Sequence, residues 1–194
     1  TTTKGNGQFA YATGTHITAN ETWSGVIKLD GWVYVDAGAT LTINAGTLIR
    51  GTEKSALIIQ RGGKINAVGT STSPIVFTSN QAAGLRTTSN WGGVVLCGNA
   101  TNNIAGGVGT AEGGITAQYG GTDDNDNSGK LQYVRIEFAG YEIATGSEIN
   151  GLTLFSVGKA TTIDHIQVSY SGDDAFEWFG GTVNAKYLIS YKTE

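Results

Sequence analysis

The most informative segment of the chain reads Ile166-Gln167-Val168-Ser169-Tyr170-Ser171-Gly172-Asp173-Asp174. Apolar side chains occupy the alternate positions 166, 168 and 170, as in a strand with one buried face. A glycine and two carboxylates follow at once. The segment therefore predicts a β-strand that ends in an acidic turn.

The same pattern of alternation and turn occurs in two other places. Its apolar residues are Val134, Ile136 and Phe138 in the first copy and Tyr187, Ile189 and Tyr191 in the last. The first copy ends at Gly140 and Glu142, and the last ends at Glu194. Successive copies are 32 and 21 residues apart, which predicts a stacked repeat with an additional loop in one coil.

Short apolar segments also alternate with glycine-containing turns between residues 25 and 79. Strands are expected at 26–29, 32–35, 40–43, 47–49, 56–59, 64–67 and 74–77. Such strands are too short for a sandwich, but they suit a solenoid whose coil has three short faces. We expect equivalent strands to pair in parallel, with Ala39–Ile43 one coil away from Gly63–Ala67.

The composition is that of a turn-rich, all-β chain. Its 194 residues include 30 glycines, one proline and no methionine, and they suffice for a single domain over 1–194. Only 14% of the residues are charged, against roughly 25% in typical globular proteins. The surface must then consist largely of uncharged polar groups, which suits an extracellular protein and hydrogen bonding to sugars.

The charge and composition of the chain disfavour several classes of function. The net charge is −4 and lysine and arginine form no cluster, so nucleic acid is not an expected partner. No apolar segment approaches the roughly 20 residues that span a bilayer. Cys97 is the single cysteine; it excludes a disulfide within the chain, and we expect it to be a small buried residue.

Two segments depart from the repeat. Residues 1–22 show weak alternation and are expected to form an N-terminal cap or pairing strand, because a stack of coils otherwise exposes its core. Residues 98–130 are rich in Gly, Asn, Thr and Asp. A loop of this length is unusual unless it is functional or mobile, and we expect a surface excursion along one face of the solenoid.

Several longer segments together resemble a known group of proteins. They are Val35–Ile43, Ala56–Thr70, Pro74–Ser79, Trp91–Leu96, Tyr133–Gly140 and Ser171–Gly181. In this order they look like the secreted and surface-anchored bacterial right-handed parallel β-helix proteins, which have the pectate-lyase-like fold.

The resemblance implies a right-handed, single-stranded parallel β-helix that is secreted or displayed on a bacterial surface. Most proteins of the group have no assigned activity. They usually continue beyond the position of Glu194, so we expect a truncation there and an open stacking end. Such an end can accept a strand from another copy of the chain.

An acidic corner is the first candidate site. If the copies stack in register, Glu142, Asp173, Asp174 and Glu194 fall along one corner, with coils about 4.8 Å apart. Carboxylates this close repel one another and need a cation, a shared proton or solvent. The corner could thus bind a cation, or it could cleave a glycosidic bond with Asp173, Asp174 and Glu142 as catalytic carboxylates.

Asp173 and Asp174 resemble the paired aspartates of the polygalacturonases. The Asn-Thr-Asp and Gly-His-Gly segments of that family are absent, however, and His165 precedes the pair instead of following it. The resemblance therefore leaves polysaccharide hydrolysis or lysis as an alternative, and a structural role for these acids is the main expectation.

A calcium site is possible in the excursion. Asp124, Asp126 and Ser128 place oxygen ligands at alternate positions before a glycine, as in the first half of a calcium loop. Arg135 stands where an EF-hand needs a bidentate glutamate. A solvated turn rich in Asp and Asn is the competing interpretation.

Aromatic side chains supply possible sugar platforms. Trp178, Tyr141 and Tyr119 could stack on pyranose rings if they are exposed. Alternation in Phe176-Glu177-Trp178-Phe179 sends one pair of side chains inward, and we expect Trp178 to belong to the core.

The sequence as a whole predicts a structural or ligand-binding module outside the cell. Its expected ligands are a polysaccharide or cell-surface glycan, calcium, or another copy of itself through the open helix ends. The alternatives are a polysaccharide-cleaving enzyme that uses the acidic corner and a subunit of a self-assembling β-helix fibre.

Overall fold

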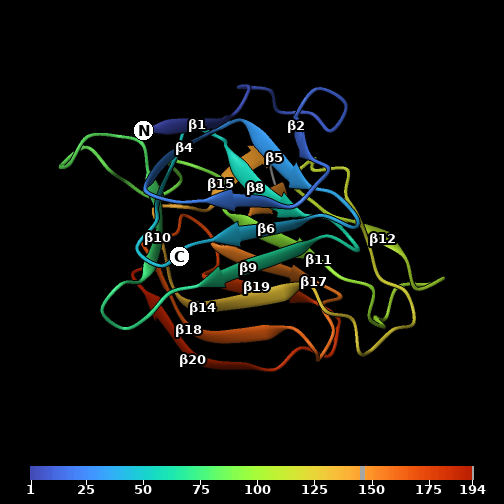
Figure 1. Cartoon of the computed structure of the whole chain (residues 1–194). Helices are drawn as coiled ribbons and strands as arrows, with labels where there is room; N and C mark the ends of the chain where they lie inside the picture. Colours follow the sequence, from blue (N-terminus) through green and yellow to red (C-terminus); the bar gives the residue numbers. More distant parts are fainter. Residues whose placement is uncertain (145–146, 194) are drawn as a thin grey trace.

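The computed structural model describes residues 1–144 and 147–193, which form strands β1 to β20 and no helix. The strands wind into a parallel β-helix, and β6, β9, β14, β18 and β20 lie one below another across the front of Figure 1. The fold predicted from the sequence is confirmed.

Two large parallel sheets build the helix. The six-stranded sheet B contains β2 (Thr15–Ile17), β5 (Trp32–Val35), β8 (Ala56–Ile59), β11 (Val94–Cys97), β17 (Leu152–Phe155) and β19 (Phe176–Phe179). The ten-stranded sheet A contains β1 (Thr2–Gly5), β3 (Glu21–Trp23), β4 (Val26–Asp30), β6 (Thr40–Ile43), β7 (Leu48–Gly51), β9 (Lys64–Val68), β10 (Ile75–Ser79), β14 (Gly129–Glu137), β18 (Thr162–Ser169) and β20 (Ala185–Tyr191). Two antiparallel hairpins, β12 (Gly109–Thr110) with β13 (Gln118–Tyr119) and β15 (Tyr141–Ala144) with β16 (Ser147–Ile149), complete the structure.

Each early coil uses three short strands, as the sequence predicts. The coil β5–β6–β7 stacks on β8–β9–β10, with Leu41 opposite Ile65 and Val33 opposite Leu57. These side chains belong to one continuous interior core. In the segment expected to form a cap, β1 pairs with β4, while β2 and β3 belong to the first coil themselves.

The later coils merge two faces into one long strand. Residues 129–132 of β14 pair with β9, and residues 134–136 pair with β10. The residue between the two halves, Tyr133, has a φ of 49°. His165 in β18 and Tyr187 in β20 have φ values of 54° and 53°. One left-handed residue therefore bends each long strand where the early coils have a turn.

The register of the last coil corrects the sequence alignment. Val134 pairs with Ile166, which confirms the spacing of 32, but Ile166 pairs with Leu188 instead of Tyr187. The last spacing is therefore 22 and not 21. A shift of one residue moves every side chain to the opposite face, so Leu188 packs against the core while Tyr187 and Ile189 are 68% and 55% exposed.

Tyr170 also departs from the predicted alternation. Its φ of 56° turns the ring away from the core position expected for it, and the ring stacks on Phe138 with centroids 5.2 Å apart. Phe138 also has a left-handed backbone, with a φ of 61°. A second bend with left-handed residues therefore ends the long strands.

A second apolar cluster lies outside sheet B. Residues 98–128 run along the outer face of this sheet, at the right of Figure 1 around β12. Ile115 and Tyr119 from this segment pack with Ile58 and Phe155 of the sheet, and the Tyr34 hydroxyl donates to the Ile115 carbonyl at 2.9 Å. Cys97 is buried in this cluster, as predicted, and burial raises the pKa of its thiol to about 12.

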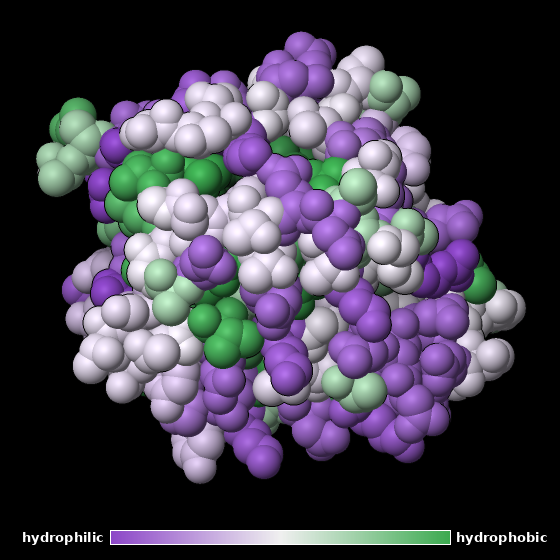
Figure 2. Space-filling view, viewed as in Figure 1, coloured by the Kyte–Doolittle hydropathy of each residue, from purple (hydrophilic) through white to green (hydrophobic). Residues whose placement is uncertain are grey.

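The outer surface of the view in Figure 2 is mostly hydrophilic, with apolar side chains in separate patches. In the described residues no helix is long and apolar enough to cross a membrane.

Candidate functional site

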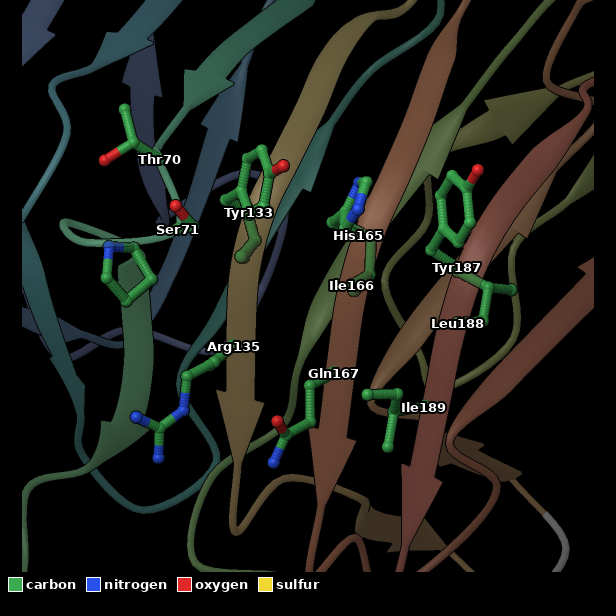
Figure 3. Close-up of a pocket in the computed structure, with 12 residues that line it drawn as sticks. Thr70, Ser71, Tyr133, Arg135, His165, Ile166, Gln167, Tyr187, Leu188 and Ile189 are labelled. Carbon is green, nitrogen blue, oxygen red and sulfur yellow. The ribbon is translucent and has the colours of Figure 1, made fainter.

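A groove runs along the bend of the long strands. Its volume is about 550 Å³ and its surface is mainly apolar. Strands β14, β18 and β20 form its floor, and the turn between β9 and β10 contributes Thr70, Ser71 and Pro74 (Figure 3). A volume of this size falls within the range of about 300–1,000 Å³ that small-molecule sites occupy.

The upper row of side chains in Figure 3 consists of Tyr133, His165 and Tyr187. The His165 ring stacks on both neighbours, with centroids 4.4 Å away on each side. A left-handed backbone costs a non-glycine residue about 1–2 kcal/mol, whereas an aromatic pair contributes about 0.5–1.5 kcal/mol beyond its buried area. The two stacks are shared by three left-handed residues, so they offset part of the strain of the bend.

The lower row consists of Arg135, Gln167 and Ile189, which pair in register across the three strands (Figure 3). Arg135 forms an ion pair with Glu137, and the Gln167 amide donates to the Ser169 hydroxyl at 2.9 Å. The guanidinium has five N–H groups and the amide has two. Donors therefore remain for a ligand in the groove.

The Arg135 and His165 side chains each have a carboxylate partner. Glu137 pairs with Arg135, and Asp164 hydrogen-bonds the Nδ1 atom of His165. The groove thus offers apolar surface, ring edges and N–H donors without a large excess of positive charge. This arrangement favours an uncharged ligand that carries hydroxyl groups.

The predicted acidic corner does not form as a row of stacked residues. Glu142 lies in the hairpin β15–β16, exposed and opposite Glu148, because this hairpin is inserted between the coils. Glu194 lies outside the described residues. Asp173 and Asp174 follow β18, and their charges reach Glu112 and Glu177 respectively. The carboxylates do gather, but with partners that the sequence alone did not identify.

The predicted calcium ligands make protein contacts of their own. Asp124 accepts hydrogen bonds from the Thr101 backbone and hydroxyl, and Asp126 accepts one from Ser128 at 3.2 Å. Within residues 1–144 and 147–193, no three His, Cys, Asp or Glu side chains are grouped to hold a metal ion. Calcium binding by Asp124, Asp126 and Ser128 stays a prediction.

The predicted sugar platforms occupy three different environments. Tyr119 belongs to residues 98–128, the covering segment of sheet B, and is buried against Phe155, so it offers no platform. The Lys54 ammonium lies over the ring of Tyr141 at 5.3 Å. Trp178 pairs in register with Leu154 on the interior side of β19, but it is 43% exposed and lies outside the buried core, so the expectation that it is a core residue is wrong.

Sequence reasoning did not find the groove residues. The first interior residue after the bend is Val134 in β14, Ile166 in β18 and Leu188 in β20. In each strand the residue immediately before it carries a large ring, and this recurrence is the signal in the sequence. The signal depends on the register, and the incorrect spacing of 21 placed Tyr187 inside. With the observed spacing, Tyr133, His165 and Tyr187 fall on one line.

Comparison with known proteins agrees with this architecture. Residues 14–194 match the family described as a pectate-lyase-like β-helix domain. Neither a curated protein nor a solved structure matches the chain. The match covers nearly the whole sequence and accounts for the parallel coils, and the chain belongs to the pectate-lyase-like β-helix domain family.

Proposed function

We propose that this domain is an extracellular or cell-surface binding module, displayed by a bacterium, that holds a neutral polysaccharide or glycan in the groove. The observation that carries the proposal is the pairing of an apolar wall of stacked rings with the donors of Arg135 and Gln167. The low content of charged residues, 14% of the chain, supports a location outside the cell.

A sugar suits the two rows of the groove. Its C–H faces pack on apolar surface, and its hydroxyl oxygens accept hydrogen bonds from arginine and amide side chains. Because the carboxylate of Glu137 pairs with Arg135 and that of Asp164 lies beside His165, an acidic glycan gains little from the groove. Neutral glycans are therefore expected to bind more tightly than uronate-containing ones.

A glycan array followed by calorimetric titration tests this proposal. Arg135→Ala and Gln167→Ala should each weaken binding of the selected glycan about tenfold, since each removes a hydrogen bond to a ligand. Lys130→Ala on β14 and Thr162→Ala on β18 are matched controls outside the groove and should bind normally. Equal weakening by Arg135→Ala and Lys130→Ala, or an array without any neutral ligand, would contradict the proposal.

Polysaccharide cleavage is a second candidate, favoured by the raised pKa of Glu177. Burial and the nearby Glu112 charge raise its pKa to about 7, and a carboxylic acid with such a pKa can protonate a leaving oxygen. New reducing ends or unsaturated products, formed by the wild type and lost in Asp174→Ala, are the expected result for an enzyme. If every polysaccharide in a broad panel remains intact, the cleavage hypothesis is rejected.

A further inference from the structure

The loop between β1 and β2 folds back onto the first coil. It comprises residues 6–14 and lies at the top of Figure 1. Backbone hydrogen bonds of 3.0 and 2.8 Å join the first half of the loop to Asp30 and Trp32. The second half contacts the coil through Tyr11, whose ring packs edge-on against the Tyr34 ring with centroids 5.2 Å apart. The position of the second half therefore depends on the contacts of Tyr11.

His16 on β2 connects this second half to the coil. Its ring stacks on Tyr34 with centroids 5.0 Å apart. The Nδ1 atom lies 2.8 and 3.0 Å from the two carboxylate oxygens of Asp36, and the Nε2 atom lies 2.9 Å from the carbonyl oxygen of Tyr11. Both ring nitrogens therefore face oxygen atoms that can only accept a hydrogen bond. A neutral imidazole has one N–H, so the imidazolium is the form that satisfies both contacts.

The titratable groups that face His16 come from three elements. Asp36 and Tyr34 belong to the coil, and Tyr11 belongs to the loop. A second groove, with a volume of about 500 Å³, contains both Tyr11 and Asp36 and also Arg61. The Arg61 guanidinium donates to a carbonyl of the covering segment at 2.7 Å. The carboxylate of Asp36 is thus the charge in direct contact with the ring.

These contacts stabilise the charged form of the ring. Burial lowers the pKa of His16, but the hydrogen bonds to Tyr11 and Asp36 and the charge of Asp36 outweigh it. The pKa of His16 is therefore raised above its ordinary value of 6.5. The folded protein then binds this proton more tightly than the unfolded chain does. The contribution to stability is complete below pH 6.5 and is lost as the pH rises through the raised pKa.

We propose that His16 is a pH-sensitive latch, which holds residues 9–13 against Tyr34 while both ring nitrogens carry a proton and releases them when Nε2 loses its proton. The Nδ1 proton stays, because the Asp36 carboxylate needs a donor. The bare Nε2 atom then faces the lone pairs of the Tyr11 carbonyl, and the contact becomes repulsive.

The release of the latch changes one wall of the second groove. Tyr34 stays in place, because its hydroxyl donates to the Ile115 carbonyl at 2.9 Å and its ring is fully buried. Tyr11 is 39% exposed and lines the groove. The loop therefore moves while the coil does not, and the groove opens on the alkaline side of the His16 titration.

A pH titration of the ring nitrogens of the full chain, followed by NMR, tests the charge. Wild-type His16 should show two protonated nitrogens below a midpoint that lies above pH 6.5, and Nε2 should lose its proton at that midpoint. Asp36→Asn should lower the midpoint by about one pH unit or more. Asp164→Asn removes the carboxylate beside the other histidine, His165, and is the matched control; it should leave the His16 midpoint unchanged.

Cross-peaks between the Tyr11 and Tyr34 rings report the position of the loop. In the wild type they should lose most of their intensity in parallel with the His16 titration. His16→Asn cannot carry the charge, so its cross-peaks should be weak at every pH. Cross-peaks between Phe155 and Phe179, whose ring centroids lie 4.4 Å apart, should persist in every protein and show that the fold is intact.

The wild-type titration decides the proposal without any variant, so a variant that fails to fold does not block the test. The latch is overturned if His16 carries a single ring proton below pH 6.5. It is also overturned if the Tyr11–Tyr34 cross-peaks keep their intensity throughout the His16 titration. Equal midpoints in the wild type and Asp36→Asn would likewise contradict the role of the Asp36 carboxylate.

Discussion

The outer faces of the two sheets differ, although both sheets belong to the same coils. Outward positions of sheet B, such as Tyr34, Ile58 and Val95, are apolar and lie under residues 98–128. The corresponding positions of sheet A, such as Thr42 and Asn66, are polar and uncovered. A β-helix can therefore have a core on both sides of one sheet and an open binding surface on the other.

The difference between the two faces follows from the amino-acid sequences of the strands. Trp32–Val35, Ala56–Ile59 and Val94–Cys97 are continuous apolar runs, as expected for strands buried on both faces. Thr40–Ile43 alternates between polar and apolar residues, as expected for a strand with one wet face. Continuous runs in a solenoid thus indicate a covering layer, and alternation indicates a free surface.

The largest effect is expected from truncation on the covered face. Ile58→Ala should destabilise the protein by about 2–5 kcal/mol, because Ile58 is fully buried although it points out of the helix. Thr42→Ala, at an outward position of sheet A, should change stability by less than about 0.5 kcal/mol. Urea unfolding measures both values, and equal effects would contradict the proposed difference between the faces.

A slightly smaller effect is expected at His165, where β18 bends on the uncovered face of sheet A. His165→Val should destabilise by about 2–4 kcal/mol, since a β-branched residue at positive φ keeps the backbone strain and loses both ring stacks. Thr162→Val on the same strand is the control and should be nearly neutral. His165→Asn should fall between the two, because asparagine tolerates a left-handed backbone. A neutral His165→Val would show that the stacked row does not support the bend.

The pH dependence of stability should report on the covered face. Burial and the Glu112 charge raise the pKa of Glu177 from its ordinary value of 4.5 to about 7. The folded protein therefore binds more protons than the unfolded chain between these values. In calcium-free buffer its stability should decrease as the pH rises from 4.5 to 7, and this contribution should be lost above 7.

Comparison with Glu177→Gln isolates this contribution, because glutamine does not titrate. Unfolding free energies measured at a series of pH values should fall less steeply in the variant than in the wild type over this interval. Identical profiles for the two proteins would show that the carboxyl pair is not coupled to folding.

The sequence was sufficient for the early coils and insufficient for the late ones. Glycines such as Gly25 and Gly46 mark the early bends and have positive φ values, so turn chemistry locates them. His165 makes the same kind of bend with a residue that carries no turn signal. Tyr187, Ile189 and Tyr191 alternate as an interior face would, and only the pairing of Ile166 with Leu188 places them outside.

The carboxyl groups that gather around Glu177 could not be predicted for a different reason. Asp173 and Asp174 were visible as an acidic turn, whereas their neighbour Glu112 comes from the covering segment, far away in the sequence. Alternation cannot pair residues across an excursion of this length. The continuous apolar runs in sheet B would have predicted that something covers that sheet, but not which side chain would meet Glu177.

Chemical-shift mapping with the glycan selected on the array tests the central claim most directly. If the open face of sheet A is the binding surface, the perturbed amides will cluster at 133–135, 165–167 and 187–189, together with the side-chain N–H signals of Arg135 and Gln167. The indole signal of Trp178 and the amides of 98–128 will remain in place. Perturbations centred on Glu112 and on 173–178 would contradict the account and move the binding surface to the covered side.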